Sequence, residues 1–431
     1  MGLVDKRLAS LSPEKQKLFD MLLRNKGLPN ESPNTQDPRM DDVSGTDTSD
    51  KSDFQLKRPL KFSLFFFSEE ATDSSVNKYD LILESAKLAD RLGFHAIWTP
   101  ERHFHPFGGL YPNPSVLSAA LAMITSKLEL RAGSVVMPLH HPIRIAEEWS
   151  VVDNLSRGRV GLGFASGWHM DDFVFAPGAY ELRKDVTFRN IEVIKKLWAG
   201  EAISWPGANG RETKVGIYPR PISKSLPIWI TSAGSEETFI RAGEIGANVL
   251  TGLTGQSLDE LGRKVGAYRQ SLAQNGYSPD AGQVSLMLHT FVGENDADIK
   301  KTVRGPMCNY LKTNLGLHRN LAQTRNSAVD VQNFTAADED ALLTFAFERY
   351  FNGSALFGTP LSCTRMLKRL NEIEIDEACC LIDFGIDAAT ILEGIRHLAS
   401  LKDRLEILGP PRVSTPVLLS QSAQPKGANH V

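Results

Sequence analysis

The order of apolar and polar positions divides the chain into a folded region and flanking segments. From residue 60 to about 408, apolar runs typical of buried β-strands alternate with stretches whose apolar residues recur at helical spacing. Residues 28–58 are rich in Asp, Ser, Thr, Asn and Pro, and residues 409–431 in Pro, Ser and Gln. We therefore predict a folded domain over 59–408, a disordered linker over 28–58 and a disordered tail over 409–431.

The folded region contains eight apolar runs, and helical pattern follows them. The predicted strands are 60–67, 94–98, 128–138, 159–167, 226–234, 247–253, 284–293 and 377–385. Near-continuous apolar strands that alternate with helices are typical of a closed parallel barrel rather than a doubly wound sheet. The span 294–376 is longer than one crossover needs, so we expect extra helices there, including 338–351, which can form a lid. The predicted fold is a TIM (β/α)8 barrel with an enlarged insertion between strands 7 and 8.

The segment 1–27 is predicted to contain a short amphipathic helix. Ser12 and Pro13 suit the N-cap and the first helical position, and Leu18, Met21 and Leu22 lie along one face. A helix of this length is marginal alone. It is expected to pack on the main domain or to dock on a partner.

Composition and charge exclude several classes of function. The net charge is -3 with a pI near 6.4, and Lys and Arg form no runs, which argues against nucleic acid or a membrane surface as partner. Apolar runs do not approach the roughly 20 residues of a membrane span, and residues 1–27 are charged, unlike a secretory signal. We expect a cytoplasmic protein whose four cysteines are reduced and in or near the core.

The residues that follow the predicted strands form a candidate site. In a barrel the loops beyond the carboxyl ends of the strands carry the reacting groups, so these residues should meet at one opening. They are Ser68 and Glu69; Glu101, Arg102 and His103; Met137, Pro138 and His140; Ala165, Ser166, Gly167, Trp168 and His169; Thr231, Ser232, Ala233, Gly234 and Ser235; Thr251; Gly293; and Asp383. The simpler alternative for the second group is a surface ion pair between Glu101 and Arg102.

Two chemistries fit these residues poorly. A hydrolytic metal site would use His103 and His105 with imidazoles from the fifth and sixth strand ends, but those positions hold Ser and Thr. A dinucleotide fingerprint would use the glycines of 161–167, but its sixth position is Ser166. Glycines along a barrel strand more simply let a flat ligand or a neighbouring side chain approach the backbone.

A flat cofactor that carries a phosphate fits the strand ends better. The run 231–235, TSAGS, precedes a predicted helix and offers small side chains and free backbone N–H groups, which bind anions. Small residues at 132–134 and 164–166 favour a broad opening. Glu236 and Glu237 suit the helix dipole but repel a phosphate, and an ordinary Ser235 helix cap is the alternative.

The chain resembles the luciferase-like flavin monooxygenases through a collinear series of segments. These are WTPERHFHPFGGLYPNPSVL, RAGSVVMPLHHPIRIAEEWSVVDNLSRGRVGLGFASGWHMDDF, PIWITSAGSEETFIRAGEIGANVLTGL and LFGTP. In sequence it is most similar to the subgroup found beside, or embedded in, nonribosomal peptide and polyketide assembly lines. The segment LSPEKQKLFDMLLRNKG is similar to linkers between modules of those enzymes.

The resemblance implies a barrel, usually a homodimer, that uses reduced FMN from a separate flavin reductase to activate oxygen. Glu101 corresponds to a carboxylate near the flavin, Arg102 stands where bacterial luciferase has its catalytic histidine, and His103 keeps the second imidazole. The substitution by Arg102 makes light emission doubtful. The implied substrate is a biosynthetic intermediate, free or held on a carrier protein.

The resemblance also implies how the flavin is held. Gly133-Ser134 falls where the family has a non-prolyl cis peptide under the flavin ring. Ala165 and Ser166 replace a Cys-Arg pair whose arginine helps to hold phosphate. Phosphate binding would then fall to the backbone around Gly234 and to a cation, for which Arg183 is a candidate.

Together these considerations give the predicted site. Its catalytic residues are His103, Arg102 and His169, the histidines being able to move a proton near neutral pH. Its cofactor-binding residues are Glu101, Gly133, Ser134, Ala165, Ser166, Trp168, Ser232, Ala233, Gly234 and Ser235, and no metal is expected. Two alternatives remain: a barrel that transfers hydride with the deazaflavin F420, and a non-catalytic module that docks on an assembly line through residues 8–26.

Overall fold

The computed structural model describes residues 56–67, 77–253, 256–324 and 336–408. The predicted N-terminal helix, the C-terminal tail and all but the last three residues of the predicted linker lie outside these ranges.

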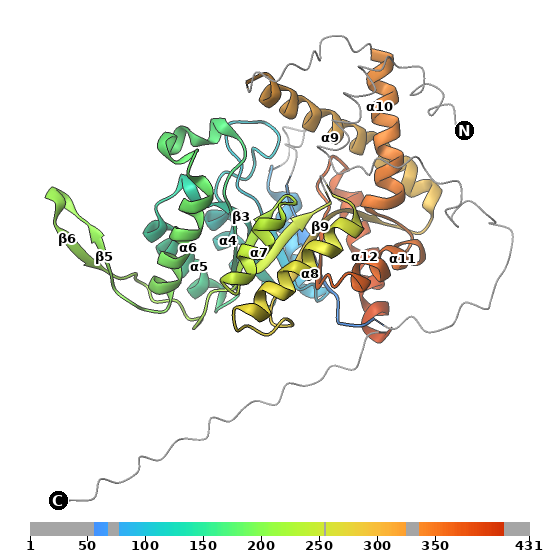
Figure 1. The fold of residues 1–431 in the computed structure, drawn as a ribbon. Helices are drawn as coiled ribbons and strands as arrows, with labels where there is room; N and C mark the ends of the chain where they lie inside the picture. The colour runs from blue at the N-terminus through green and yellow to red at the C-terminus, as the bar shows by residue number, and fades with distance from the viewer. Residues whose placement is uncertain (1–55, 68–76, 254–255, 325–335, 409–431) are drawn as a thin grey trace, which may run out of the picture.

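The described chain forms a closed parallel barrel, which confirms the fold predicted from the sequence (Figure 1). Its strands are β1 (Lys61–Phe65), β2 (Ala96–Thr99), β3 (Glu129–Val136), β4 (Val160–Ala165), β7 (Ile228–Ser232), β8 (Asn248–Gly252), β9 (Val284–Val292) and β11 (Glu377–Leu381). Each strand pairs with the next one along this order, β11 pairs with β1, and the pairing of β8 with β9 completes the closure. Each observed strand lies within or close to one of the apolar runs.

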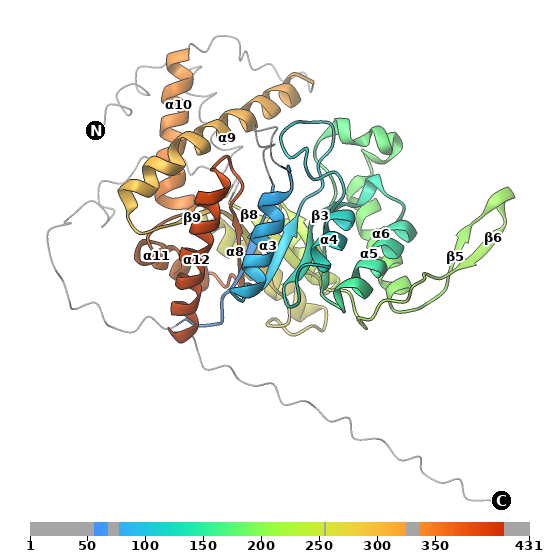
Figure 2. The ribbon, with the colours of Figure 1, turned by 180° about the vertical axis from the view of Figure 1, so that it is seen from behind.

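Helices surround the barrel (Figure 2), and many of the apolar side chains on them are buried in the core. They are α3 (Asp80–Arg91), α4 (Pro114–Ala122), α5 (Pro142–Ser156), α6 (Arg183–Trp198), α7 (Glu236–Glu244), α8 (Leu258–Gln274), α11 (Pro360–Glu372) and α12 (Ala388–Leu408). Local sequence fixes several starts: the Asn113 side chain accepts the N–H groups of Ser115 and Val116, and Ser257 forms a capping box with Glu260. In the described ranges no helix combines the length and apolar character that a membrane crossing requires.

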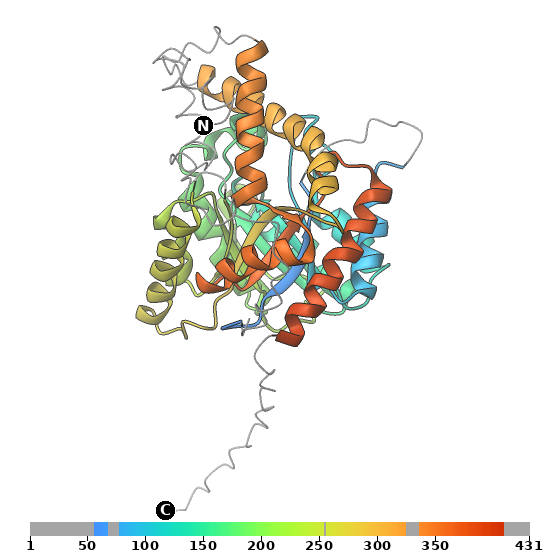
Figure 3. The same ribbon diagram turned by 90° about the vertical axis from the view of Figure 1, so that its right-hand side faces the viewer.

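Two parts of the fold depart from a simple barrel. The hairpin of β5 (Ile203–Pro206) and β6 (Glu212–Val215) extends away from the barrel (Figure 1) and was not predicted, because its short strands lack a buried face. Between β9 and β11 the chain forms α9 (Asp296–Thr324), α10 (Ala336–Arg349), a π-helical turn (Tyr350–Ser354) and β10 (Leu356–Gly358) before α11. Helices α9 and α10 stand on the side of the barrel where the strands end (Figure 3).

The interior of the barrel near the strand starts is held by a buried ion pair. Arg131 donates to Glu377 at 2.8 and 3.0 Å, and its guanidinium carbon lies 4.9 and 4.3 Å from the ring centres of Trp98 and Trp229. Burial opposes the charged carboxylate, but Arg131 outweighs it and lowers the pKa of Glu377 to about 2. The pair is therefore a fixed structural element at the bottom of the barrel.

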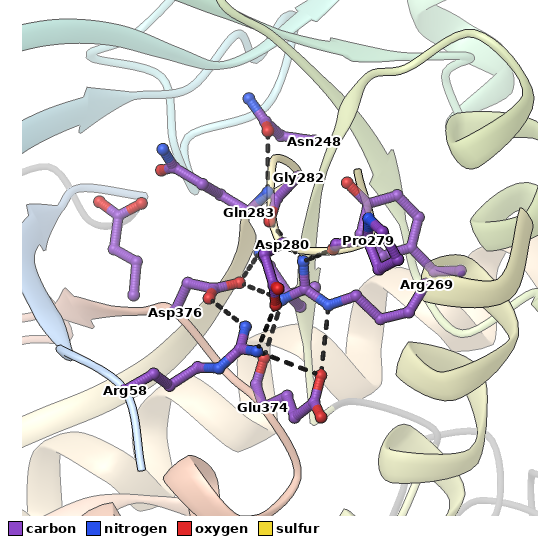
Figure 4. A network of polar contacts seen from close by, with 12 residues as sticks. Arg58, Asn248, Arg269, Pro279, Asp280, Gly282, Gln283, Glu374 and Asp376 are labelled. Atoms are coloured by element: carbon purple, nitrogen blue, oxygen red, sulfur yellow. Dashed lines mark hydrogen bonds and ion pairs between the residues drawn. The ribbon is translucent and has the colours of Figure 1, made fainter. Parts of the chain in front are cut away.

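A second polar network closes the same end from outside (Figure 4). Asp376, just before β11, accepts hydrogen bonds from Arg58 at 3.0 Å and from Arg269 of α8 at 2.7 Å. Arg58 also contacts Asp280 at 3.0 Å. These contacts join the chain before β1 to the β8–β9 connection. They stabilise the end of the barrel where the strands begin, and reacting groups in barrels lie at the other end, where the strands finish.

The cysteines are free thiols, as predicted. Cys363, Cys379 and Cys380 are buried and Cys308 is half-buried. Burial raises the pKa of the Cys380 thiol to about 12, so it is a poor nucleophile.

Candidate functional site

Glu101 follows β2, and its carboxylate is enclosed by three hydrogen-bonding groups. Its Oε1 lies 2.8 Å from Nε2 of His103 and 2.5 Å from Nε2 of His140, and its Oε2 accepts a 2.7 Å bond from the N–H of Val136. Only 1% of the side chain is exposed. Both oxygens are thus engaged, and the carboxylate fixes two imidazoles and the end of β3.

The charges in this cluster reinforce one another. Burial opposes the ionised form of Glu101, but the hydrogen bonds from His103 and His140 outweigh it, so the pKa of the carboxyl is lowered. Burial would likewise lower the pKa of His140, but Glu101 raises it. The arrangement therefore favours an ionised Glu101 beside a protonated His140.

The next strands bring small residues together at the barrel mouth. The Gly133–Ser134 peptide is cis, as the resemblance predicted. Ser134 Oγ lies 2.5 Å from Thr231 Oγ1, which links β3 to β7. A Cβ on Gly163 would lie 2.7 Å from the carbonyl oxygen of Ala132. The glycine in β4 thus serves the close approach of β3.

The turn after β7 is stabilised by hydrogen bonds of the Ser232 side chain, and the first turn of α7 has no side-chain cap. Ser232 Oγ accepts the N–H of Gly234 and donates to the carbonyl of Ser235, both at 3.3 Å. Ser235 makes no capping hydrogen bond through its side chain, so the ordinary cap considered from the sequence is absent. Ala233 is exposed, and Gly234 has φ +120°.

A lysine from α8 lies beside this turn. A Cβ built on Gly234 would lie 3.6 Å from Lys264 Nζ and 3.5 Å from Gln256 Oε1. Lys264 donates to Gln256 at 2.9 Å, Gln256 donates to Thr251 Oγ1 at 3.1 Å, and Thr251 donates to the Ser232 carbonyl at 2.8 Å. This chain positions a cation next to the start of α7.

Arg183, the cation suggested by the sequence, is engaged by its own turn. Its Nη1 donates to the Tyr180 carbonyl at 2.7 Å, and its guanidinium lies 4.3 Å from the centre of the Tyr180 ring. Lys264 is the cation that the structure places beside Gly234.

Arg102 and Glu101 are both buried and do not form the surface ion pair considered from the sequence. The residue is only 5% exposed, and its guanidinium carbon lies 5.6, 5.9 and 5.2 Å from the ring centres of Phe67, Phe107 and Trp168. Burial lowers its pKa, and the charge of Asp172 opposes this.

The loop after β4 carries the remaining predicted residues. Ala165 pairs with Val136 and thus lies near Glu101, and Ser166 follows, half-buried. Trp168 is 43% exposed. His169 Nδ1 lies 3.6 Å from Asp172 Oδ1, beyond hydrogen-bonding distance, and burial raises the pKa of Asp172.

The predicted residues therefore fall into two groups. Glu101, Ser134, Ala165 and the 232–235 turn join along adjacent strand ends from β2 to β7, with His103 held by Glu101. Arg102, Trp168 and His169 form a second group beside Phe67 and Phe107.

Sequence reasoning gave no role to three residues of this region. His140 appeared at a strand end, but its contact with Glu101 spans 39 positions. Lys264 lies on a helix far along the chain from Gly234. His289 on β9 sits within an apolar run; burial lowers its pKa to about 3, and its ring lies 4.5 Å from that of Tyr310.

Metal binding finds no support among the described residues. No group of three or more His, Cys, Asp and Glu side chains there is arranged to hold a metal ion. His103 is bound to Glu101, and His105 accepts the N–H of Phe107 at 3.0 Å.

Comparison with known proteins finds flavin-dependent and other monooxygenases among the relatives of this chain. The oxygenase component of the flavin-dependent trigonelline monooxygenase of Acinetobacter baylyi is 31% identical over 244 residues, which is 56% of this chain and 67% of the relative. Limonene 1,2-monooxygenase of Rhodococcus erythropolis is 26% identical over 323 residues, 73% of this chain and 77% of the relative.

Solved structures share the fold at low identity. The oxygenating constituent of 3,6-diketocamphane monooxygenase of Pseudomonas putida, in complex with FMN, aligns with a TM-score of 0.64 at 18% identity, over 80% of this chain and 98% of its own. The coenzyme F420 dependent tetrahydromethanopterin reductase of Methanopyrus kandleri aligns with a TM-score of 0.61 at 17% identity, over 80% and 99%. The model of the family described as luciferase-like monooxygenase matches residues 60–377. This chain belongs to the luciferase-like monooxygenase family.

Proposed function

We propose that this protein is an FMN-dependent monooxygenase that receives reduced FMN from a separate flavin reductase and oxidises an intermediate of natural-product biosynthesis. Among the relatives, the trigonelline enzyme is named as an oxygenase component, and the camphane structure contains FMN. The observation that carries the cofactor assignment is the anion cradle at the start of α7.

The cradle fits a phosphate in three respects. The start of a helix presents free N–H groups and positive dipole, Gly234 has no side chain to fill the space, and Lys264 supplies a cation. Glu236 and Glu237 are exposed, and Glu237 lies 3.6 Å from Lys184. Their repulsion of a phosphate is therefore weakened by solvent and by an ion pair.

The flat part of the cofactor would lie across the small residues of adjacent strands. Ser134 within β3 and Ala165 at the end of β4 have short side chains, whereas the space beside Gly133 is filled by Phe65 and Trp98. Bound reduced FMN supplies the electrons that activate molecular oxygen. The chain itself must orient this group, exclude water and move protons.

The proton-handling groups in this proposal are two histidines. Glu101 holds His103 through Nε2, which leaves Nδ1 as the atom that exchanges a proton. His169 is only 12% exposed and has Asp172 as its neighbouring carboxylate. The rings of Phe67, Phe107 and Trp168 provide an apolar wall on the same side.

The decisive experiment measures oxygen chemistry directly. Purified protein, FMN and an NADH-driven flavin reductase should show substrate-dependent uptake of isotopically labelled oxygen, with one labelled atom in the product. Trigonelline, limonene and thioester-bound acids form a reasonable first panel. Anaerobic turnover with F420 and none with FMN would instead establish the hydride-transfer alternative. Absence of flavin binding combined with tight binding to an assembly-line protein would establish the docking alternative.

We also propose that the substrate is tethered to a carrier protein of an assembly line. The support is the resemblance of the chain to that subgroup and of residues 8–26 to module linkers, a segment outside the described residues. Mass spectrometry of a loaded carrier protein after turnover should show a mass gain of one oxygen atom. No gain on the carrier, with turnover of the free acid, would reject the tether.

A homodimer is part of the same proposal. Helices α4 and α5 pack side by side and expose Val116, Met123, Val151 and Leu155, with exposed fractions from 42% to 70%. Apolar side chains gathered on neighbouring helices are typical of a protein interface. Light scattering should give twice the chain mass, and Leu155→Glu should give a monomer; a wild-type monomer would contradict the proposal.

A further inference from the structure

Arg102 is a buried cation for which the described residues provide no anionic partner. The residue is 5% exposed, and Nε is buried without a hydrogen-bond partner. Within the described ranges no carboxylate oxygen lies within 4.0 Å of the guanidinium; Asp172 acts on it only from a longer distance. The backbone N–H of Arg102 bonds to the Tyr111 carbonyl at 2.9 Å, so the main chain is satisfied while the charge is not.

The surroundings of the guanidinium are aromatic. The ring centres of Phe67, Phe107 and Trp168 lie 5.2 to 5.9 Å from it. The ring of Tyr310 on α9 meets that of Phe107 edge to face, with the ring centres 5.3 Å apart. Contacts with aromatic rings stabilise a cation only in part. Removing a charge from water is costly, so a buried guanidinium that has rings but no counter-ion around it favours the binding of an anion.

The side chain is also held in place. A Cβ on Gly108, which has φ +79°, would lie 2.7 Å from Arg102 Cγ, so the loop backbone packs directly on the aliphatic stem. A guanidinium fixed in this way loses little conformational freedom when it binds a ligand.

The other buried arginines show how this chain treats a purely structural guanidinium. Among the described residues three arginines are buried: Arg102, Arg131 and Arg269. Arg131 also lies beside aromatic rings, but it contacts Glu377 at 2.8 Å and Glu129 at 2.6 Å. Arg269 contacts Asp376 at 2.7 Å. Arg102 has the aromatic neighbours of Arg131 without the carboxylates, which indicates that a ligand completes the pair.

We propose that Arg102 binds a carboxylate carried by the substrate, so that the enzyme acts on an organic acid with a planar or otherwise apolar body. The guanidinium matches a carboxylate through two parallel hydrogen bonds, and the aromatic rings suit the apolar body. This inference rests on the proposed function for the reaction that the acid undergoes. It assigns Arg102 to binding, because a guanidinium stays protonated and cannot act as a base.

The cofactor phosphate is not the anion in question. Its cradle at Gly234 follows β7, whereas Arg102 follows β2, and β3 and β4 lie between these strands in the barrel. Lys264 already serves the cradle.

The test compares benzoate with benzamide, which have the same shape but differ in charge. Calorimetry on the FMN-loaded full chain should show benzoate binding at least about tenfold more tightly, because a charge-assisted contact is worth about 1.5–3 kcal/mol. Arg102→Met should abolish this preference and leave FMN affinity unchanged, and Arg102→Lys should restore part of it. Arg396→Met, which removes a 54% exposed arginine on α12, is the matched control and should behave as wild type.

Three outcomes would overturn the proposal, and a fourth would bear on the proposed function alone. Equal affinity of wild type for benzoate and benzamide, or a benzoate preference that survives Arg102→Met, would show that Arg102 does not select an acid. Loss of FMN binding in a folded Arg102→Met variant would assign the guanidinium to the flavin. Failure of the wild type to bind FMN would instead contradict the proposed function. If the flavin-free wild type still preferred benzoate and Arg102→Met lost this preference, the assignment of Arg102 to an acid site would hold.

Discussion

Replacement of His140 by Gln tests the charge pair beside Glu101. In the wild type, His140 Nε2 lies 2.5 Å from Glu101 Oε1, and His103 and the Val136 N–H complete the set around the carboxylate. Glutamine still donates a neutral hydrogen bond, so the variant loses only the charge assistance. We expect a loss of about 1–2 kcal/mol of unfolding free energy where His140 is protonated.

The pH dependence of this loss has a definite sign. Because Glu101 raises the pKa of His140, its contribution is fully present below the unfolded value of about 6.5 and disappears as pH rises through the raised folded value. The pKa of Glu101 is lowered, so its contribution is present above its unfolded value of about 4.3 and is lost only as pH falls through the lowered folded value. The pair should therefore stabilise the fold most at about pH 5–6 and much less at about pH 9.

Thermal unfolding followed by circular dichroism measures the effect. For 431 residues the entropy of unfolding is about 0.9 kcal/mol/K, so the loss corresponds to about 1–2 °C at about pH 6 and near zero at about pH 9. His141→Gln is the control, since in the described chain His141 contacts Trp205 and no carboxylate within ion-pair distance. An equal or larger His140→Gln effect at the higher pH would refute the assigned charge pair.

Two further substitutions test the barrel itself. Glu377→Gln should lower the unfolding free energy by about 3 kcal/mol, because it removes the buried carboxylate that Arg131 contacts at 2.8 Å and leaves this guanidinium with the half-buried Glu129 as its ion-pair partner. Since the folded pKa of Glu377 is about 2, its contribution to stability is present above the unfolded pKa and is lost as pH falls through the folded pKa. Denaturant unfolding in which the variant is as stable as the wild type at neutral pH would contradict this prediction. Gly163→Ala should cost about 1–3 kcal/mol, because its Cβ would lie 2.7 Å from the Ala132 carbonyl oxygen. Gly305→Ala, with open space around it, should be neutral or stabilising in the same melts; equal effects of both alanines would argue against backbone crowding at β4.

The sequence predicted the barrel because burial on both faces makes parallel strands apolar throughout, a signal that does not depend on long-range contacts. The same logic missed β5 and β6, which have no buried face, and β10, which is only three residues long. The order of strand ends also placed Glu101, Ser134 and the 232–235 turn around one mouth. The roles of the individual side chains were less accessible.

Those roles depend on contacts between distant segments. Glu101 was expected near the flavin, but His140 and the Val136 N–H, supplied by the next strand, enclose its carboxylate. Lys264 reaches Gly234 from another helix, and no local motif marks it. That Arg102 has no ion-pair carboxylate among the residues described by the structure is likewise a property of the folded packing, which residue order does not encode.

The central claim is that the mouth of the barrel binds FMN with its phosphate between Gly234 and Lys264. Fluorescence titration of the wild type and of Lys264→Met with FMN and with riboflavin, which lacks the phosphate, tests it most directly. We predict that the wild type binds FMN at least about tenfold more tightly than riboflavin, and that Lys264→Met loses most of this difference with little change for riboflavin. Equal affinities for the two flavins, or no binding of either, would contradict the account.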